Sequence, residues 1–451
     1  MNILALLQSI QPDLSNTDLR RFSRIAQAML CLVGRVTMLG LSRWTGKGGS
    51  YRTVQRFFST VLPWTAIFGQ FFEQHLYQPE HEYFLAGDEC VVTKSGKTTH
   101  GLDYFFSGLL NKIVPSIAIF TVSLVSLEER QAYPLQVRQV VRSAAEKAAA
   151  QARKKKPAKK EPPQPKRKPG RPKGSRNQDK TQVALTEELQ RIQTTVKQQV
   201  ARFKGRIRLR HIALDGYFGH NNALQMVRQC DLHLISKLRR DAALYFRYDG
   251  PQNSRGPHKR YGQKIDYQQL PEQYLVERRS EAGHETRIYQ AELLHREFAQ
   301  PLNVVILTKT HLHSGAFANV NLFSSDLELG YAELIDRYSL RFQIEFNFRD
   351  AKQHWGLEDF MNVKEVPLTN ALNLSLFMVN LSQVLLREFR QTHPESGILD
   401  LKTHFRAARY LEETIKWLPQ KPEPILLEQI FGRLSGLGRI HDVKVLDTSS
   451  P

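Results

Sequence analysis

The chain has 451 residues, a hydrophobic fraction of 41% and a formal net charge of +20. This length suffices for two or three domains with large cores, and the composition excludes a chain that is mainly disordered. The positive charge indicates a polyanionic partner, with nucleic acid ahead of an anionic membrane surface. The apolar stretch 113–127 contains a proline and three serines and is too short to span a bilayer, so we expect no membrane partner.

Residues 1–78 have helical patterns, and we expect them to form a DNA-binding region. An amphipathic helix is predicted over residues 17–33, and a basic, aromatic helix that Ser50 is placed to cap is predicted over 51–58. A glycine-rich turn separates the two. This arrangement is typical of a helix-turn-helix, and an ordinary helical hairpin is an equal alternative.

Residues 79–365 show β-rich runs that alternate with helical patterns. In chain order, three strands are followed by a helix, a charged segment, a helix, a strand, a helix and a strand. This order predicts an α/β (α+β) fold of the RNase H-like type: a mixed five-stranded sheet with helices on both faces. The expected strands are 83–92, 101–110, 113–127, 207–214 and 232–238, and the expected helices are 134–152, 186–203 and 221–229.

The charged segment, residues 153–180, predicts a disordered basic linker. The window 151–180 contains 13 Lys and Arg, two acidic residues and six prolines. Its sequence Gly170-Arg171-Pro172, flanked by basic residues, resembles an AT-hook, in which Arg171 would lie in a narrow A·T minor groove. A non-specific polycation that binds by counterion release is the equal alternative. Both predict DNA contacts from Lys166, Arg167, Lys168, Arg171 and Lys173.

The remaining chain is expected to hold a second insertion and a helical C-terminal region. Residues 242–330 are strand-rich with Gly and Pro turns, and a helix is predicted over 331–354. The region 366–451 begins with a long apolar helix over 368–389. We expect this helix to be either core or a dimer interface.

Two aspartates stand out in the predicted strands: Asp88 comes directly after the apolar segment 83–87, and Asp215 directly after 207–214. Each alone could be a turn former, which is the commoner role of Asp in such a position. Asp215 is followed, after the next predicted helix, by Lys237 in the last core strand. Lys237 could contact a DNA phosphate or lie in a solvated turn.

The predicted helix 331–354 carries four polar side chains on a stripe about 60° wide, at 100° per residue. They are Tyr338, Arg341, Glu345 and Lys352. The stripe suits a helix that faces a metal ion and a phosphate chain, and the alternative is an exposed helix with ion pairs. Arg341 and Lys352 are placed to hold phosphates, and Tyr338 to hydrogen-bond a phosphate or stack on a base.

Convergence of Asp88, Asp215 and Glu345 would require cations. Two like charges roughly 4 Å apart repel by about 4 kcal/mol at an effective dielectric near 20. Oxygen ligands select Mg²⁺ or Mn²⁺ over zinc. Two such ions ~3.5–4 Å apart can activate a water or a 3′-hydroxyl and stabilise the leaving oxygen of a phosphodiester.

The spacing Tyr-x2-Arg-x3-Glu-x6-Lys resembles the YREK signature of bacterial insertion-sequence transposases, which are DDE enzymes with an RNase H-like catalytic domain. The segments 87–97 and 214–219 resemble the surroundings of their first and second aspartates. The resemblance implies that Asp88, Asp215 and Glu345 are catalytic and hold two Mg²⁺ ions, with Asp88 bridging both. It also implies nicking of double-stranded DNA at terminal inverted repeats, joining of the 3′-hydroxyl ends to target DNA, and a homodimer on DNA.

Other properties and two alternatives complete the expectations. Three distant cysteines and the absence of a signal-peptide pattern predict a cytoplasmic protein. The resemblance implies that it is associated with the bacterial nucleoid. Related enzymes can stack a Trp of the insertion on a flipped base, but this insertion has no Trp. A domesticated, non-catalytic DNA-binding regulator would keep the basic segments without needing the three carboxylates. A tyrosine recombinase with Tyr338 as nucleophile would need a preceding Arg and His-x-x-Arg cluster, which we do not find.

Overall fold

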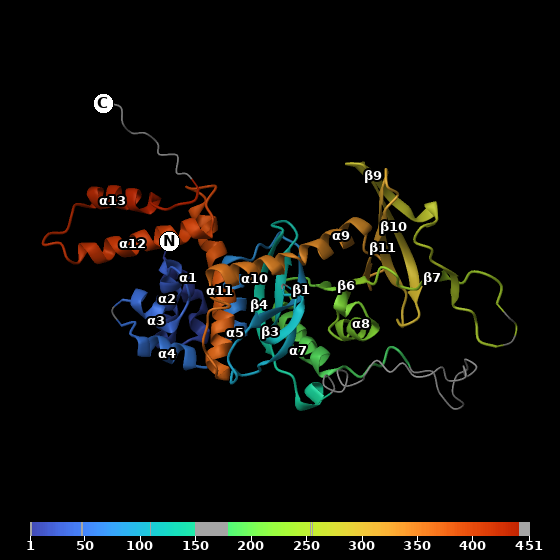
Figure 1. The fold of residues 1–451 in the computed structure, drawn as a ribbon, viewed down its shortest axis with the longest axis horizontal. Coiled ribbons are helices and arrows are strands. Elements are labelled where there is room, and N and C mark those ends of the chain that lie inside the picture. Colours follow the sequence, from blue (N-terminus) through green and yellow to red (C-terminus); the bar gives the residue numbers. More distant parts are fainter. Residues whose placement is uncertain are drawn as a thin grey trace, which may run out of the picture.

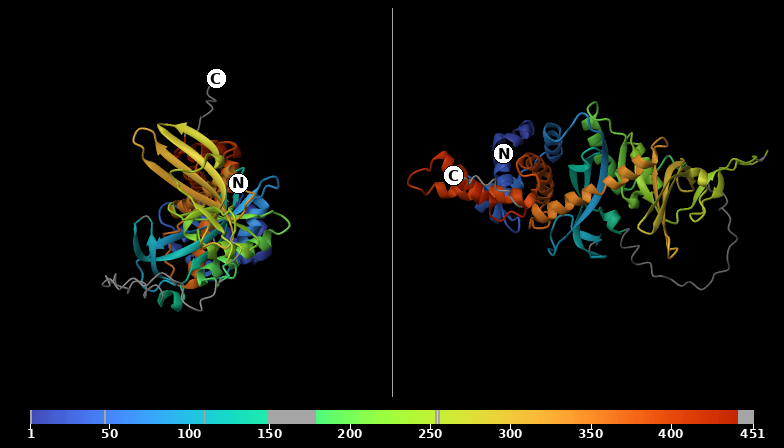
Figure 2. Two further views of the ribbon diagram at one scale, coloured as in Figure 1. Left: turned by 90° about the vertical axis from the view of Figure 1, so that its right-hand side faces the viewer. Right: turned by 90° about the horizontal axis from the view of Figure 1, so that it is seen from above.

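The computed structural model describes residues 2–441 except 47, 109, 149–178, 253 and 255. Helices gather at one end of an elongated molecule, a sheet runs through its middle, and the second insertion projects at the other end (Figures 1 and 2). The predicted basic linker lies outside the described residues, apart from Asp179 and Lys180. No helix of the described part combines the length and apolar character that a membrane span needs.

The N-terminal region is helical, as predicted. Ser50 caps its fourth α-helix by accepting a hydrogen bond from the backbone N–H of Thr53, and Ser15 caps the second through Asp18. The elements are α1 (Ile3–Leu7), the 3-10 helix η1 (Gln8–Asp13), α2 (Asn16–Cys31), α3 (Met38–Trp44), α4 (Tyr51–Ser59) and α5 (Trp64–His75).

The central sheet is mixed and RNase H-like, as the sequence predicts. Strands β1, β3 and β4 are antiparallel neighbours, and β5 and β6 continue the sheet parallel to β1, in the order β4-β3-β1-β5-β6. Strand β2, which the sequence predicts over 101–110, pairs with the first residues of β3, whereas β4 is an additional strand. The bounds are β1 (Tyr83–Thr93), β2 (Asp103–Ser107), β3 (Lys112–Ser126), β4 (Gln131–Val140), β5 (His211–Leu214), η2 (Gly216–Phe218), α8 (Asn221–Arg228) and β6 (His233–Leu238).

The helix predicted over 134–152 is wrong in its first half, because residues up to Val140 belong to β4. The register of β4 on β3 shifts between Val122 and Ser123, where Pro134 pairs. Such an irregularity tolerates a residue that cannot donate a backbone hydrogen bond. The alanine-rich residues that suggest a helix begin only after the strand, where 144–148 are helical.

Helices cover both faces of the sheet, as predicted (Figure 1). On one face lie α10 (Gln343–His354) and α11 (Glu365–Phe389), where Asn347 and Asn380 donate hydrogen bonds to backbone carbonyls of β4 at 2.9 and 2.8 Å. On the other face lies α7 (Glu187–Phe203), beneath which Glu89 of β1 lines a cavity.

The second insertion extends the central sheet. Its last strand pairs antiparallel with β6, from Asn321 opposite Leu238 to Ser324 opposite Ile235. The order continues β12-β11-β10-β7-β8, with β9 also on β10. The bounds are β7 (Leu244–Arg247), β8 (Tyr261–Lys264), η3 (Glu272–Tyr274), β9 (Leu275–Glu281), β10 (His284–His295), β11 (Leu302–His311) and β12 (Phe317–Ser324).

The C-terminal helices complete the core of the N-terminal ones. Phe377 of α11 packs on Phe22 and Phe71 at ring distances of 5.0 and 4.9 Å. Helix α11 is buried along most of its length, so it is core, the first of its two predicted roles. Helix α12 (Ile398–Ile415) packs on α2, and α13 (Pro424–Gly436) follows it.

Asn370 of α11 offers a test of this packing. Its amide donates to the carbonyls of Phe58 and Thr60 at the end of α4, and it accepts from Trp64 Nε1 at 2.7 Å. We expect Asn370→Ala to lower the free energy of unfolding by about 3 kcal/mol, because buried polar groups lose their partners. Urea denaturation measures this. Asn373→Ala, which loses a bond to Thr369 within its own helix, is the control and should cost about 1 kcal/mol; equal losses would contradict the expectation.

Candidate active site

Parallel pairing brings Asp88 and Asp215 together. Strands β1 and β5 are neighbours, with Gly87 opposite Leu214, so the next residue of each strand is one of the two aspartates. Backbones of paired strands lie about 4.8 Å apart. Asp88 continues within β1, whereas Asp215 leaves β5 at its end.

The turn after β5 explains the sequence Asp-Gly-Tyr-Phe-Gly. Asp215 caps the short helix η2 by accepting from the backbone N–H of Tyr217 at 3.1 Å, and its own carbonyl accepts from Ser236 Oγ at 2.7 Å. Gly219 passes so close to β6 that a Cβ there would lie 2.3 Å from the carbonyl of Lys237. Lys237 therefore lies next to this turn, with its side chain exposed.

Arg341 joins Asp88 to the helix that carries Glu345. The predicted helix 331–354 is divided into α9 (Tyr331–Leu340) and α10, with Arg341 at the junction. The Arg341 guanidinium pairs with Asp88 and lies 3.6 Å from Glu345, and its side chain is 11% exposed. The ring of Tyr338 lies 5.8 Å from the same guanidinium.

The carboxylates of this site repel one another. Burial raises the pKa of Asp88 despite the opposing effect of Arg341, and Asp215 raises it further. Burial also raises the pKa of Glu345, to which Asp88 and Asp215 both add. The site thus favours bound positive charge, which Arg341 supplies here.

Lys352 of α10 contacts β1 at a point further along the strand than Asp88. Its Nζ pairs with Glu358 at 2.8 Å and is 3.4 Å from the backbone carbonyl of Val91. Tyr338, Arg341 and Glu345 therefore gather at Asp88, as their helical spacing predicts, whereas Lys352 is engaged beside them.

Two further side chains at the site were not singled out from the sequence. Glu89 lines a cavity of about 130 Å³ on the opposite face of β1, and burial together with Glu188, Asp215 and Asp88 raises its pKa to about 7. Thr121 of β3 lies directly opposite Asp88, and its buried hydroxyl has no hydrogen-bond partner among the described residues. Proximity to Asp88 in sequence was the only signal for Glu89, and no signal pointed to Thr121.

The three carboxylates are ligands that suit a hard divalent cation, but they do not lie close enough together to enclose one. Three carboxylates provide only oxygen ligands, which Mg²⁺ and Mn²⁺ prefer. Within the part of the chain that the structure describes, no three His, Cys, Asp or Glu side chains lie close enough to hold a metal ion. The Arg341 guanidinium instead contacts two of the three. The predicted DNA-binding residues Lys166, Arg167, Lys168, Arg171 and Lys173 lie outside the described residues.

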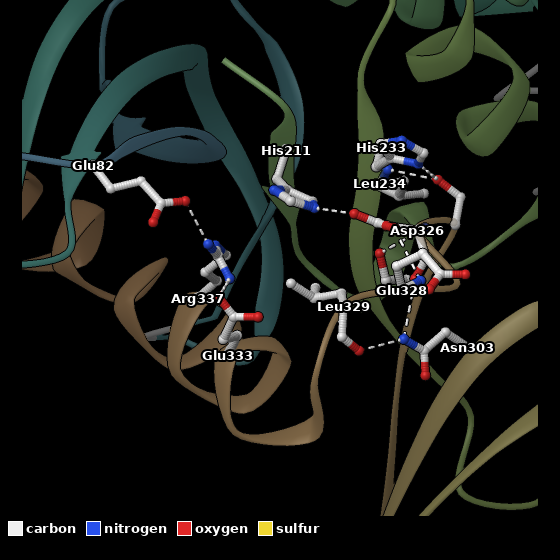
Figure 3. Close-up of polar contacts among 12 residues, drawn as sticks. Glu82, His211, His233, Leu234, Asn303, Asp326, Glu328, Leu329, Glu333 and Arg337 are labelled. Carbon is white, nitrogen blue, oxygen red and sulfur yellow. Dashed lines mark hydrogen bonds and ion pairs between the residues drawn. The ribbon is translucent and has the colours of Figure 1, made fainter. Parts of the chain in front are cut away.

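A second polar cluster lies around the last turn of α9 and the segment that precedes this helix (Figure 3). Arg337, 3% exposed, pairs with Glu82 before β1 at 2.6 Å and with Glu333 at 3.1 Å. His211 at the start of β5 contacts Asp326 at 2.9 Å. Glu82 and His211 lie at the beginnings of β1 and β5, so Arg337 ties α9 to the start of β1, and Asp326 in the segment before α9 contacts the start of β5.

The sheet order, the paired aspartates and the helix that brings Glu345 define an RNase H-like α/β protein. A sequence model of the family described as DDE superfamily endonuclease matches residues 9–295. The chain belongs to this family. The match includes Asp88 and Asp215 and ends before Glu345. No curated protein matches the chain.

Arg337 should be a main source of stability for α9. We expect Arg337→Met to lower the free energy of unfolding by about 2–3 kcal/mol, because a buried cation with two partners is lost. Arg130→Met is the matched control, since Arg130 also pairs with an acid of α9, Asp336 at 2.9 Å, but is 58% exposed. The control should cost less than about 1 kcal/mol in urea denaturation. A control loss as large as that of Arg337→Met would contradict the assigned role.

Proposed function

We propose that the protein is an insertion-sequence DDE transposase with the YREK signature. It binds the terminal inverted repeats of an element, nicks double-stranded DNA by metal-assisted phosphodiester hydrolysis and joins the 3′-hydroxyl ends to target DNA. Its place of action is the bacterial nucleoid in the cytoplasm. The observation that carries the proposal is the approach of Glu345 to the paired aspartates through Arg341. Membership of the DDE endonuclease family supports nuclease chemistry on DNA.

Asp88, Asp215 and Glu345 would hold two Mg²⁺ ions, with Mn²⁺ as a substitute. The ions would supply activation of a water or 3′-hydroxyl and stabilisation of the leaving oxygen. The mutual repulsion of these carboxylates supports this role, because bound cations would relieve it. Thr121, the cross-strand neighbour of Asp88, has a buried hydroxyl without a partner among the described residues, and this hydroxyl would donate to a carboxylate oxygen and orient it.

Arg341 and Tyr338 would act on the DNA backbone. A guanidinium that binds a carboxylate can bind a phosphate in the same forked geometry, so Arg341 can exchange Asp88 for DNA as cations enter. Burial raises the pKa of Tyr338, so its phenol keeps its proton and serves as a hydrogen-bond donor.

Further DNA contacts would come from the basic linker, Lys237 and the N-terminal helices. Helix α4 buries Val54, Phe57 and Phe58 and turns Arg52 and Arg56 to solvent. An amphipathic helix with basic residues on its outer face suits the groove or backbone of duplex DNA.

A non-catalytic DNA-binding regulator remains the second candidate. The observation that favours it is the ion pair between Arg341 and Asp88. With this pair formed, Asp88, Asp215 and Glu345 do not lie close enough together to hold a metal ion. Metal-dependent cleavage distinguishes the two functions.

Replacement of any one carboxylate should abolish chemistry while leaving DNA binding intact. We expect Asp88→Asn, Asp215→Asn and Glu345→Gln each to reduce joining of a 3′-hydroxyl oligonucleotide to plasmid by at least a thousandfold, about 4 kcal/mol of transition-state stabilisation. The oligonucleotide carries the end sequence that flanks the gene. Glu412→Gln, an exposed carboxylate of α12, is the control and should join normally. Joining by Glu345→Gln would show that another residue is the third ligand. Firm end binding without cleavage by the wild type would favour the regulator.

The homodimer is proposed to form through α12 and α13, since α11 is core. The α12–α13 region exposes large apolar side chains, with Trp417 86%, Ile425 70% and Leu437 69% exposed. We expect Trp417→Ser with Ile425→Ser to leave the DNA-bound protein monomeric in sedimentation, because burial of such side chains drives association. Val61→Ser with Met361→Ser, at comparably exposed positions on other loops, is the control and should remain dimeric. A dimer of unchanged stability in the first variant would exclude this interface.

A further inference from the structure

The hairpin of β7 and β8, at the outer edge of the sheet, has two different faces. One face packs inward, where Phe246 stacks on Tyr274 at 5.0 Å and Ile265 is buried. The other face carries Tyr245 and Tyr261, whose rings meet edge to face at 5.4 Å. Packing of the inner face holds the hairpin on the rest of the insertion. The aromatic side chains of the outer face are not needed for that packing.

Cations cover the outer aromatic rings. The Arg296 guanidinium lies 4.9 Å from the ring centre of Tyr245 and 5.7 Å from that of Tyr261, and the Arg260 guanidinium lies 5.9 Å from Tyr261. Lys259 Nζ lies 5.2 Å from the ring of Tyr248. Stacking on a ring restricts a long cationic side chain before any ligand arrives, so less entropy is lost on binding.

Four cations around this face are not paired with acids of the described chain, whereas Arg247 of β7 pairs with Glu292 at 2.7 Å. We name Lys259, Arg260, Lys264 and Arg296 the hairpin surface; all four are exposed. Among the described residues none of the four forms an ion pair with a carboxylate. The arginines of β9 and β10 differ, since Arg278, Arg279 and Arg287 are all paired with Glu272, Glu277 or Glu285. The insertion thus pairs the arginines of β9 and β10 with acids and leaves the four cations of the hairpin surface without acidic partners among the described residues.

We propose that the hairpin surface binds the phosphate backbone of duplex DNA away from the candidate active site. This inference rests on the proposed function, which supplies the DNA. The rings of Tyr245 and Tyr261 are already covered by guanidinium groups, so base stacking is not their task. Four exposed donors without acidic partners suit phosphates, whose counterions they would release. The contact therefore adds affinity and orientation without reading sequence.

The sheet sets the distance of this contact from the cleavage point. Between β5, which ends at Asp215, and β8 lie β6, β12, β11, β10 and β7 in hydrogen-bonded succession. At about 4.8 Å per strand step, these six steps span roughly 30 Å across the sheet. Duplex DNA rises 3.4 Å per base pair, so the hairpin surface should reach phosphates roughly eight or nine base pairs from the cleavage position.

The test compares two triple variants with equal loss of charge. The first is Lys259→Gln, Arg260→Gln and Arg296→Gln; the matched control is Arg278→Gln, Arg279→Gln and Arg287→Gln, whose arginines are paired with acids. Fluorescence anisotropy measures Kd for the element's end between about 50 and 200 mM salt. One duplex extends well beyond the cleavage position on both sides. Two others are cut to about five base pairs beyond it, on one side or the other. Thermal unfolding of each variant confirms that it is folded.

We expect the slope of log Kd against log salt on the long duplex to fall by about 2–3 in the first variant and to stay unchanged in the control. On the duplex shortened on the side that the hairpin contacts, the first variant and the wild type should bind alike. Equal slopes for the first variant and the wild type on the long duplex would overturn the inference, as would a larger effect on single-stranded than on duplex DNA. Failure of the wild type to bind any of these duplexes would instead remove the proposed function, and this inference with it.

Discussion

The parallel pairing of β1 with β5 is the constraint on which the candidate site depends. It sets Asp88 beside Asp215, because Gly87 lies opposite Leu214. A Cβ at Gly87 would lie 2.8 Å from side-chain atoms of Leu214 and Phe120, so the glycine permits this close approach. A register shift of one residue would send a carboxylate to the other face of the sheet, where α7 packs. The strand geometry thus fixes two of the three acids before any helix contributes.

The third acid depends on two arginines of one helical segment. Arg337 is buried and ties α9 to Glu82 at the start of β1, and Arg341, one turn later, pairs with Asp88 further along the same strand. The segment is therefore fastened to β1 at two points before it reaches Glu345. Arg341 both holds α10 on β1 and screens the negative charges of Asp88 and Glu345. The position of the helix and the charge of the site are therefore coupled. A ligand that draws Arg341 away from Asp88 changes both at once.

Local patterns in the sequence were sufficient for much of the fold and for part of the site. The strands before Asp88 and Asp215 and the helical stripe of Arg341 and Glu345 follow from periodicity over a few residues. Local patterns failed to predict the structure where contacts between residues far apart in the sequence determine it. Strand β4 is stabilised by its pairing with β3, which overrides the helical appearance of an alanine-rich tail. The junction at Arg341 and the pairing of Lys352 with Glu358 depend on packing against β1, and the union of β12 with β6 has no local signal at all.

Phe377 has a consequence for the order in which the protein is made. It completes the aromatic packing around Phe22 and Phe71, although roughly 300 residues of synthesis separate it from the latter. At translation rates of about 5–20 residues per second, the first helices wait roughly 15–60 s with their apolar faces uncovered. The aromatic core that Phe377 completes therefore cannot form until α11 has been synthesised. By then the whole central sheet has left the ribosome's active centre, so the two ends of the chain complete one core late in synthesis.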